Sequence, residues 1–459
     1  QMLSNPLETP YGSNIFNQNV NAYVKLGLPV GPERTFTGDP NDAVQNNFAM
    51  VLDYDNYLTD SYFGINTVDV REHTSRFNAT YAHYFTQRSS LNVGASAYLR
   101  AMNNDYLQQR VEGGLPTQSW AFNGNAMLIE PGIFAEYTYN IEEKFSLVVG
   151  LRGDYSIVEG DYYYNDVKAL PLITPRSHIK WNITPRTTLR ASAGLGHRRQ
   201  NLITDNIWMM TTSRDIKIDN LENDMESAAT FGGSLSQTFR LANDDQATIS
   251  FDYFRTQFLN TMVFDQERAD NTIHIYNLEA KDGGKSFTDN YQVDFNWTPF
   301  KGFDLFATFR YTNAKMTVED ANGQKHLVER PLTSRYKGLI NIQYAVRRWV
   351  FDVTAQLNGP MRLPELTYDS TSVSDTGANA VKAVENPELS PIYPMFFAQV
   401  SYKVSNFTIY AGCENIGDKT QWRPIKGYDK PYEPGFNSSM VWGPLSGIKG
   451  YIGIRLNIY

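Results

Sequence analysis

The sequence is poor in the features that mark most enzymes and metalloproteins. Its single cysteine, Cys413, cannot form a disulfide within the chain and excludes any metal or redox site built from several cysteines. The six histidines are not accompanied by an H-E-x-x-H or G-x-S-x-G motif, and a phosphate-binding loop is also missing. We therefore predict a protein that is not an enzyme, with no catalytic residues, no metal ligands and no cofactor.

The chain also lacks long apolar runs and an excess of positive charge. No run of 18 or more apolar residues occurs, which excludes a helical membrane span. The formal net charge of −8 argues against a nucleic-acid partner. Aromatic residues, in contrast, are plentiful at 14% of the chain, with 29 Tyr, 26 Phe and 7 Trp, which is more than an ordinary core needs.

Apolar and polar residues alternate over most of the chain. The clearest segment is 144–157, where Phe145, Leu147, Val149 and Leu151 alternate with polar or small residues. A period of two places the two sets on opposite faces of a β-strand. The same alternation recurs, without a comparable helical pattern, in segments 189–195, 249–253, 291–297, 303–311, 351–357 and 396–402. The sequence therefore predicts one very large antiparallel sheet.

Short and long connections alternate between these segments. Seven short links, rich in turn-forming residues, are expected at 87–90, 140–143, 184–186, 242–245, 299–302, 347–348 and 405–406. Eight long links are expected at 59–71, 105–127, 158–170, 198–223, 259–285, 317–329, 360–390 and 416–440. This asymmetry predicts an all-β transmembrane barrel in a Gram-negative outer membrane, with tight turns at one rim and extracellular loops at the other.

The composition agrees with a barrel of this kind. The mean hydropathy of −0.43 is low, but only alternate residues of a barrel strand face lipid. The abundant aromatic residues suit rings placed at the two membrane interfaces. Residues 1–459 are therefore predicted to form one transmembrane domain.

The links imply sixteen strands, and the segment from Asn21 to Leu28 suggests a seventeenth. Single-chain bacterial barrels have even strand numbers, so we expect about five further strands before Gln1 and a complete barrel of about 22 strands. Barrels of that size carry a plugged lumen. The alternative is a complete sixteen-stranded porin whose first 45 residues form an irregular extension.

Four stretches of the sequence carry a family resemblance. They read TPRSHIKWNITPRTTLRASAGLGHRRQNLITDNIW from Thr174, FLNTMVFDQ from Phe258, YKVSNFTIYAGCENIGDKTQ from Tyr402 and MVWGPLSGIKGYIGIRLNIY from Met440. Their order and spacing over residues 170–459 resemble the C-terminal part of the barrel in TonB-dependent outer-membrane receptors of the Bacteroidetes type. The resemblance implies a 22-stranded barrel with a globular plug, expected upstream of Gln1 and not in this chain, and energy delivered through TonB.

The function that the resemblance implies is active import of a scarce ligand such as a siderophore, vitamin, metal chelate or oligomeric nutrient. A passive porin and a structural or docking barrel of an envelope complex are the alternatives. The expected partners are outer-membrane lipid and lipopolysaccharide, the TonB complex by way of an N-terminal plug, and a surface lipoprotein or other envelope proteins. The sequence does not identify the ligand.

Two sets of residues are candidates for a transport function. Charged residues predicted to line the lumen could serve transport, or could solvate the wall and hold a plug through salt bridges; they are Arg152, Asp154, Arg176, Lys180, Arg190, Asp252, Arg310, Asp352 and Glu414. A second set, in the loop that follows one strand, is predicted to contact the ligand; it comprises His197, Arg198, Arg199, Asp205, Asn206 and Trp208.

The chemistry of this loop leaves several interpretations open. Adjacent arginines favour an anionic ligand, such as a carboxylate or phosphate. The neighbouring Met209 and Met210 favour either a soft metal or simple packing. A second aromatic patch, Tyr162 to Tyr164, could stack on a sugar or an aromatic ligand, or belong to a membrane-interface ring.

Overall fold

Twenty strands of one sheet make up most of the described residues in the computed structural model. The structure describes residues 6–9, 11–36, 43–161, 169–219, 221, 224–242, 245–268, 270–320, 322–364, 388–433 and 435–456. These residues also form three short 3-10 helices: η1 (Pro6–Glu8), η3 (Thr204–Thr211) and η4 (Ala280–Asp282). Within these described ranges, no helix has the length and apolar character needed to cross a bilayer.

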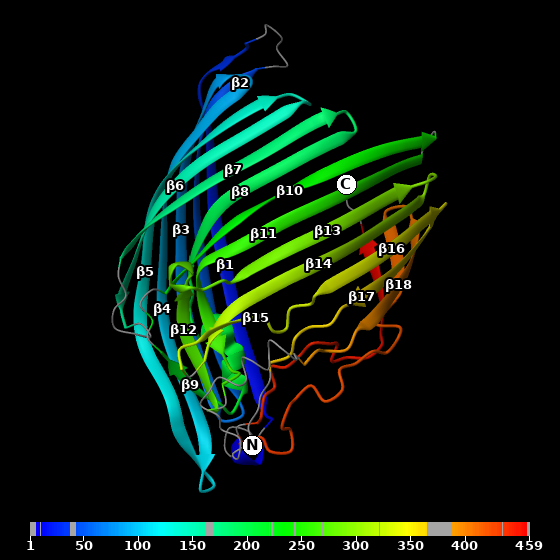
Figure 1. Cartoon of the computed structure of the whole chain (residues 1–459). Coiled ribbons are helices and arrows are strands. Elements are labelled where there is room, and N and C mark those ends of the chain that lie inside the picture. The colour runs from blue at the N-terminus through cyan, green and yellow to red at the C-terminus, as the bar shows by residue number, and fades with distance from the viewer. Residues whose placement is uncertain are drawn as a thin grey trace.

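Most of the strands form a curved wall in which each strand pairs antiparallel with the next (Figure 1). The wall strands are β1 (Ser13–Arg34), β2 (Val44–Phe63), β3 (Asn66–Thr86), β4 (Ser89–Glu112), β5 (Leu115–Ile141), β6 (Phe145–Gly160), β7 (Leu170–Thr184), β8 (Thr187–Arg199), β10 (Met225–Ala242), β11 (Asp245–Asp265), β13 (Phe287–Thr298), β14 (Phe303–Glu319), β16 (Tyr336–Val346), β17 (Trp349–Asn358), β18 (Tyr393–Val404), β19 (Phe407–Glu414) and β20 (Lys449–Leu456). Short strands β9 (Asp215–Ile218), β12 (Thr272–Glu279) and β15 (Lys325–Glu329) lie in the long links.

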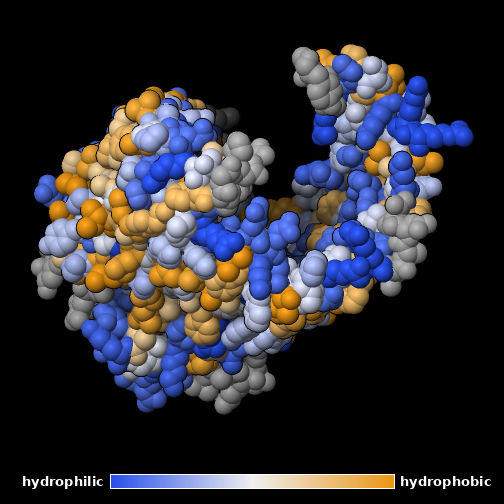
Figure 2. All heavy atoms as spheres, turned by 90° about the horizontal axis from the view of Figure 1, so that it is seen from above, coloured by the Kyte–Doolittle hydropathy of each residue, from blue (hydrophilic) through white to orange (hydrophobic). Residues whose placement is uncertain are grey.

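Seventeen of the twenty strands therefore belong to the wall, as the sequence predicted. The wall is not a closed cylinder, because no pairing of the described residues joins β1 to β20. Figure 2 shows that the wall curves around a hollow that stays open on one side. The porin alternative is wrong in one respect: residues 13–34 form a regular strand paired with β2, so the first 45 residues are not an irregular extension.

The predicted short links agree with the strand ends, and the two residues between β10 and β11 lie outside the described part. Arg347 and Ser405 begin two-residue turns with φ angles of 54° and 52°. Such hairpins need the left-handed conformation because its twist matches that of the strands. These turns lie at one end of the wall.

Two predicted long links are wrong. Residues 59–71 and 105–127 are mostly strand, since β2 and β3 meet across residues 64–65 and β4 and β5 meet across Gly113 and Gly114. These strands extend beyond the band of apolar, lipid-facing residues on the outside of the wall. Their two faces therefore no longer alternate between apolar and polar residues. The backbone ladder continues, however, and inward side chains such as Tyr106 are buried by other loops. The predicted link 360–390 falls largely outside the described residues.

Hydrogen bonds identify the face of the wall that points into the hollow. The Arg152 guanidinium donates to Ser96 Oγ at 2.7 Å. Ser96 shares one face of β4 with Met102 and Tyr106, which folded loops bury on the concave side. Val149 and Leu151 point the opposite way and are 47% and 56% exposed, which is the arrangement predicted for a lipid-facing set.

Aromatic residues form two rows on the convex face, one nearer the short turns and one nearer the loops. The row near the turns comprises Trp181, Phe239, Trp297, Tyr344, Trp349, Tyr402 and Phe407. The row near the loops comprises Tyr155, Tyr253, Tyr291, Tyr311 and Tyr336. The rings are close, with centroids 4.6 Å apart for Trp349 and Tyr402 and 4.9 Å apart for Tyr253 and Tyr291. The two rows match the aromatic girdles of membrane barrels.

The two faces of β6 can be tested with neighbouring valines. Val149→Arg places a charge on the lipid face and should lower the free energy of unfolding by about 2–4 kcal/mol. Val148→Arg places the same charge on the concave face and should cost less than about 1 kcal/mol, because water reaches that face. Urea unfolding in lipid vesicles measures both values. Equal losses, or a larger loss for Val148→Arg, would contradict the assigned orientation.

Candidate functional site

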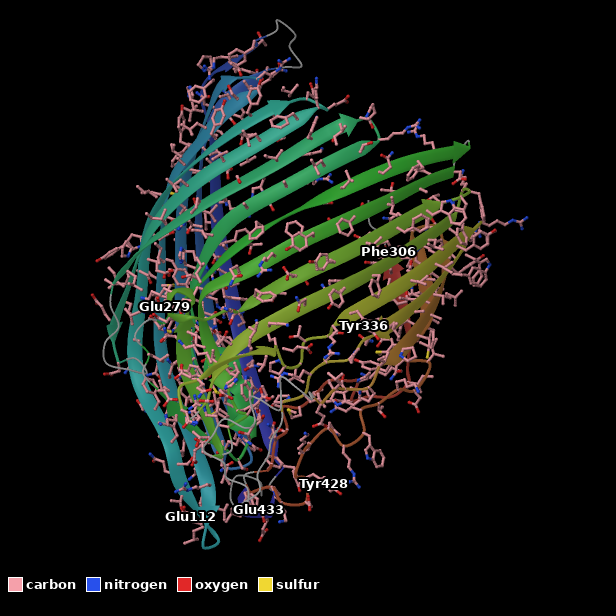
Figure 3. The ribbon with its side chains drawn as sticks, viewed as in Figure 1. Glu112, Glu279, Phe306, Tyr336, Tyr428 and Glu433 are labelled. Carbon is pink, nitrogen blue, oxygen red and sulfur yellow. The ribbon has the colours of Figure 1, made fainter. Side chains whose placement is uncertain are left out.

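The long links gather at the end of the wall opposite the short turns and fold into a compact layer, which we call the loop cluster. Figure 3 places Glu112, Tyr428 and Glu433 at this end of the molecule. The loop cluster comprises residues 200–219, 259–268, 270–285, 415–433 and 435–448, with η3, β9 and β12 among them. It packs against the concave faces of β3 and β4.

The loop cluster has its own apolar core. Residues of η3, of the turn before it and of β12 contact side chains of β3 and β4. Nine side chains of this core are completely buried; they are Val68, Val70, Tyr106, Leu202, Ile203, Met209, Met210, Ile273 and Ile275. Burial of a whole aliphatic side chain contributes roughly 1.5–3 kcal/mol. The links are therefore held in place by a core rather than only by their ends.

Two buried ion pairs hold the links in place, one across the two ends of a single link and one between links 95 residues apart. Arg199 and Asp224 approach to 2.6 Å with side chains 2% and 5% exposed. Arg362 forms two hydrogen bonds with Glu267, of 2.5 and 2.7 Å, and lies 1% exposed. Loss of one partner from such a pair leaves an uncompensated buried charge and typically costs 3–5 kcal/mol. These pairs therefore fix how the links meet.

His274, on β12, joins two further segments of the loop cluster. Its Nδ1 lies 2.7 Å from Asp219, which follows β9, and its Nε2 lies 2.6 Å from Asp270. Both ring nitrogens donate to a carboxylate only when the imidazole is protonated. Burial lowers the pKa of His274, but the hydrogen bonds to Asp270 and Asp219 outweigh it, and the net shift is upward.

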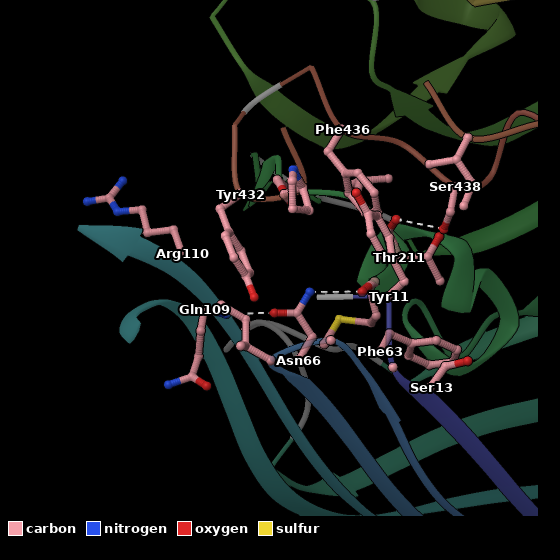
Figure 4. A pocket seen from close by; sticks show the side chains of 18 residues that line it. Tyr11, Ser13, Phe63, Asn66, Gln109, Arg110, Thr211, Tyr432, Phe436 and Ser438 are labelled. Atoms are coloured by element: carbon pink, nitrogen blue, oxygen red, sulfur yellow. Dashed lines mark hydrogen bonds between the residues drawn. The ribbon is translucent and has the colours of Figure 1, made fainter. Parts of the chain in front are cut away.

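A cavity of about 190 Å³ lies where five separate segments of the chain meet (Figure 4). We call it the loop-end pocket. Its walls come from the segment before β1, the β2–β3 hairpin, the end of β4, the end of η3 and the link before β20. Aromatic side chains on the wall are Tyr11, Phe63, Tyr432 and Phe436, and Gln109, Arg110 and Asn66 stand along one side.

The polar groups of the loop-end pocket are mostly engaged with one another. The Asn66 amide donates to the Met210 carbonyl at 2.8 Å and its oxygen accepts from the Gln109 backbone at 2.8 Å. The Ser438 hydroxyl donates to the Thr211 carbonyl at 2.9 Å, and the Ser213 hydroxyl donates to the Pro431 carbonyl at 2.9 Å. These bonds join the β2–β3 hairpin, β4, the end of η3 and the link before β20 around the cavity.

The residues predicted to contact the ligand do not form one exposed set. Arg198 is 62% exposed in its side chain and pairs with Asp205 at 2.7 Å. Arg199 points the other way and is buried with Asp224. Asn206 bonds to the Leu202 carbonyl, Trp208 packs on the apolar core, and His197 lies 3.0 Å from the Ser227 hydroxyl. The two arginines therefore do not point at one common anion. Arg198 and Asp205 keep exposed charges, and their contact with a ligand stays a prediction.

The structure also bears on the methionines of this loop and on the possibility of a metal site. Met209 and Met210 are fully buried in the apolar core, which agrees with the packing interpretation. Over the described part of the chain, no group of His, Cys, Asp and Glu side chains could hold a metal ion. Tyr162, Tyr163 and Tyr164 lie outside the described residues.

The residues predicted to line the lumen all lie on the concave face according to the cross-strand register. Arg152 pairs with Asp154 at 2.5 Å, and Arg176 pairs with Glu136 at 2.6 Å. Lys180 stands directly opposite Arg190. The remaining members of the set, Asp252, Arg310, Asp352 and Glu414, share this face. A part for them in transport stays a prediction.

His274 and the aromatic residues of the loop-end pocket were not predicted from the sequence. No local motif marks them, because His274 and Asp219 are 55 residues apart and Tyr11 meets Phe436 from the far end of the chain. The signal that was available is compositional: the link 416–440 holds several aromatic residues in a polar stretch.

The His274 contacts predict a pH-dependent stability of the loop cluster. Because the folded-state pKa is raised, the contribution is complete below the unfolded value of about 6.5 and is lost as pH rises through the folded value. Arg268, 3.5 Å from Nδ1, lowers the pKa of His274, and Asp265 is a further neighbour whose own pKa is raised by burial. The protection factors of the amides of residues 272–279, which correct for the intrinsic rise of exchange with pH, should therefore fall as pH rises through the folded-state pKa.

A variant and a control separate this effect from general instability. His274→Gln should show low protection factors for these amides at all pH values, because the doubly donating ring is gone. His83→Gln, whose ring lies near the short turn that follows β3, should behave like the parent protein. A fall of the protection factors with pH that survives in His274→Gln would contradict the assignment.

Comparison with known proteins agrees with this architecture. The family model described as "TonB dependent receptor-like, beta-barrel" matches residues 5–416. Similar solved structures include the siderophore receptor PiuA from Acinetobacter baumannii (15% identity, 96% of this chain and 65% of that chain, TM-score 0.57). The pyoverdine outer-membrane receptor FpvA from Pseudomonas aeruginosa PAO1, bound to pyoverdine, is similar over 97% of this chain and 62% of its own (10% identity, TM-score 0.64).

The copper transporter OprC is also similar (14% identity, 97% of this chain and 66% of that chain, TM-score 0.61). At these identities the structures show a shared fold, and this chain spans less than two thirds of each of them. No curated protein matches the chain.

The family consists of outer-membrane transport proteins of Gram-negative bacteria, which confirms the prediction that the chain is not an enzyme. The family match over most of its length shows that the chain belongs to the TonB-dependent receptor β-barrel family.

Proposed function

We propose that this protein imports a scarce ligand across the outer membrane by active transport. The supporting observation is the combination of the family match with a loop cluster that is folded, ion-paired and hollowed by a cavity. A pore for passive diffusion needs no such structured cap. A receptor does, because a fixed arrangement of loops lowers the entropy cost of holding a ligand.

Energy coupling and partners form part of this proposal. Binding at the loops cannot by itself move a ligand against its gradient, because it supplies no work once the site is filled. We propose that TonB supplies this work through a plug, as the family resemblance implies, and that the loop cluster is extracellular.

Outer-membrane lipid and lipopolysaccharide would surround the convex face, and a surface lipoprotein is a further candidate partner. The Bacteroidetes type remains part of the proposal, on the four sequence stretches that carry it.

The ligand class is drawn from what similar proteins carry. Those proteins are described as a siderophore receptor, a ferric citrate transporter and a copper transporter. A scarce metal or its chelate is therefore the first class to test, followed by vitamins and oligomeric nutrients. Arg198 and Asp205 are the proposed loop contacts, because their charges remain accessible whereas those of Arg199 and Asp224 are buried together.

The exposed ion pair can be separated from the buried one by mutation. Arg198→Gln should weaken uptake about ten-fold with little change in stability, since exposed ion pairs contribute 0–1 kcal/mol. Lys217→Gln, in an equally exposed pair with Asp219, is the matched control and should leave uptake unchanged. Uptake of radiolabelled ferric chelates, copper and cobalamin by whole cells provides the measurement.

Two further measurements test the transport mode. Uptake should vanish when the gene is deleted and when a protonophore collapses the proton gradient. A steady open channel of nanosiemens order from the full-length protein in planar bilayers would contradict active import and support a passive porin. Unchanged uptake after deletion, with stoichiometric envelope proteins co-purifying, would support a structural or docking barrel.

A further inference from the structure

We infer that the loop-end pocket holds an uncharged aromatic ring carried by the ligand. The inference rests on the proposed function, because it names one chemical part of what is imported. It adds a site that lies apart from Arg198 and Asp205 and is built from segments distant in the sequence. Its basis is the size of the cavity, the residues on its wall and the state of their hydrogen bonds.

The size of the loop-end pocket fits a single ring. Its volume is about 190 Å³. An engineered apolar cavity of roughly 150 Å³ in another protein is large enough to hold benzene. A phenyl or phenol group therefore fits, with space for a substituent or a linker, whereas a whole metal chelate of several rings does not.

The wall of the pocket favours an aromatic occupant over an aliphatic one. Four aromatic side chains, Tyr11, Phe63, Tyr432 and Phe436, come from three different segments. The rings of Tyr11 and Phe436 are 6.2 Å apart at an angle of 43°, so their edges and faces are both presented. Aromatic pairs gain about 0.5–1.5 kcal/mol beyond the area they bury.

The hydrogen bonds of the wall argue that the occupant is uncharged. The side chains of Asn66, Ser213 and Ser438 bond to protein groups, and the Tyr432 hydroxyl donates to the Leu7 carbonyl at 3.0 Å. A buried charge is costly unless such groups can turn toward it. Arg110, the one cationic side chain on the described wall, stands at its edge and is ion-paired with Glu112 at 2.8 Å and with Asp215 at 3.3 Å. The pocket therefore suits a neutral ring, and any anionic part of the ligand would lie outside it.

The position of the pocket suits capture. Phe63 and Asn66 belong to the concave side of the wall, and the link before β20 lines the opposite side of the cavity. A ring seated there would contact several of these segments at once. It would thereby hold the rest of the ligand at the entrance to the hollow of the wall.

Filling the cavity provides the test, with a matched control in the same link. Ile425 lines the pocket and is half-buried, so Ile425→Trp should fill it. Ile416 is 43% exposed and does not line the pocket, so Ile416→Trp adds the same ring elsewhere. The probes are phenol and cyclohexanol, which are similar in size but differ in aromaticity, and N-acetyltryptophanamide, which presents its ring on a peptide.

Saturation-transfer NMR on the full-length protein in lipid nanodiscs would measure binding. Phenol should bind at least ten-fold more tightly than cyclohexanol, and more tightly than the peptide-borne ring, which is large for a cavity of about 190 Å³. Ile425→Trp should abolish the phenol signal and Ile416→Trp should retain it. Phe436→Leu, which removes a ring but keeps an apolar group, should weaken phenol about two- to ten-fold and leave cyclohexanol unchanged.

Several results would overturn the inference. They are equal binding of phenol and cyclohexanol, phenol binding that persists in Ile425→Trp, and preference for the peptide-borne ring, which would indicate a protein occupant. The proposed function fails separately: if cells import nothing through the protein but Ile425→Trp still removes phenol binding, the pocket stands and import does not. Heat resistance of the folded band in detergent gels confirms that each variant is folded.

Discussion

The structure depends on one constraint, which is that backbone amide and carbonyl groups inside a membrane must find partners within the protein. Between its two edges the wall meets this constraint with an antiparallel ladder from β1 to β20, and the outer edges of β1 and β20 have no strand partner among the described residues. Because a strand alternates its side chains, the ladder separates a lipid face from a hollow face at every residue. The aromatic rows, the charged concave face and the low mean hydropathy all follow from this separation.

The loop cluster meets a different requirement, since it lies beyond the apolar band and must fold in water. It does so as a small domain would, with a buried core around Leu202 and Ile273 and with ion pairs where links cross. Extension of β2 to β5 past the band gives this core a rigid floor. The rigidity of the wall is in this way transmitted to the segments that surround the loop-end pocket.

The wall could be predicted from the sequence and most of the site could not, for a physical reason. Local rules govern a strand: Val149 and Leu151 reveal their face by period two, and Arg347 marks a turn by its place between two strands. The rules failed at residues 105–127 because both faces of those strands contact water or loops instead of lipid. In the site, contacts such as that between Arg199 and Asp224 arise only after the links have folded, so no spacing announces them.

Spin-label accessibility along β6 tests the central claim most directly. With Cys413 replaced by serine, single cysteines at positions 145–154 would carry a nitroxide in lipid vesicles, and collisions with oxygen and with a water-soluble nickel chelate would be measured. Oxygen contact is predicted to peak at every odd position and nickel contact at every even one. A flat profile, a period near 3.6 residues or the opposite phase would contradict a wall with lipid on one side and a hydrated hollow on the other.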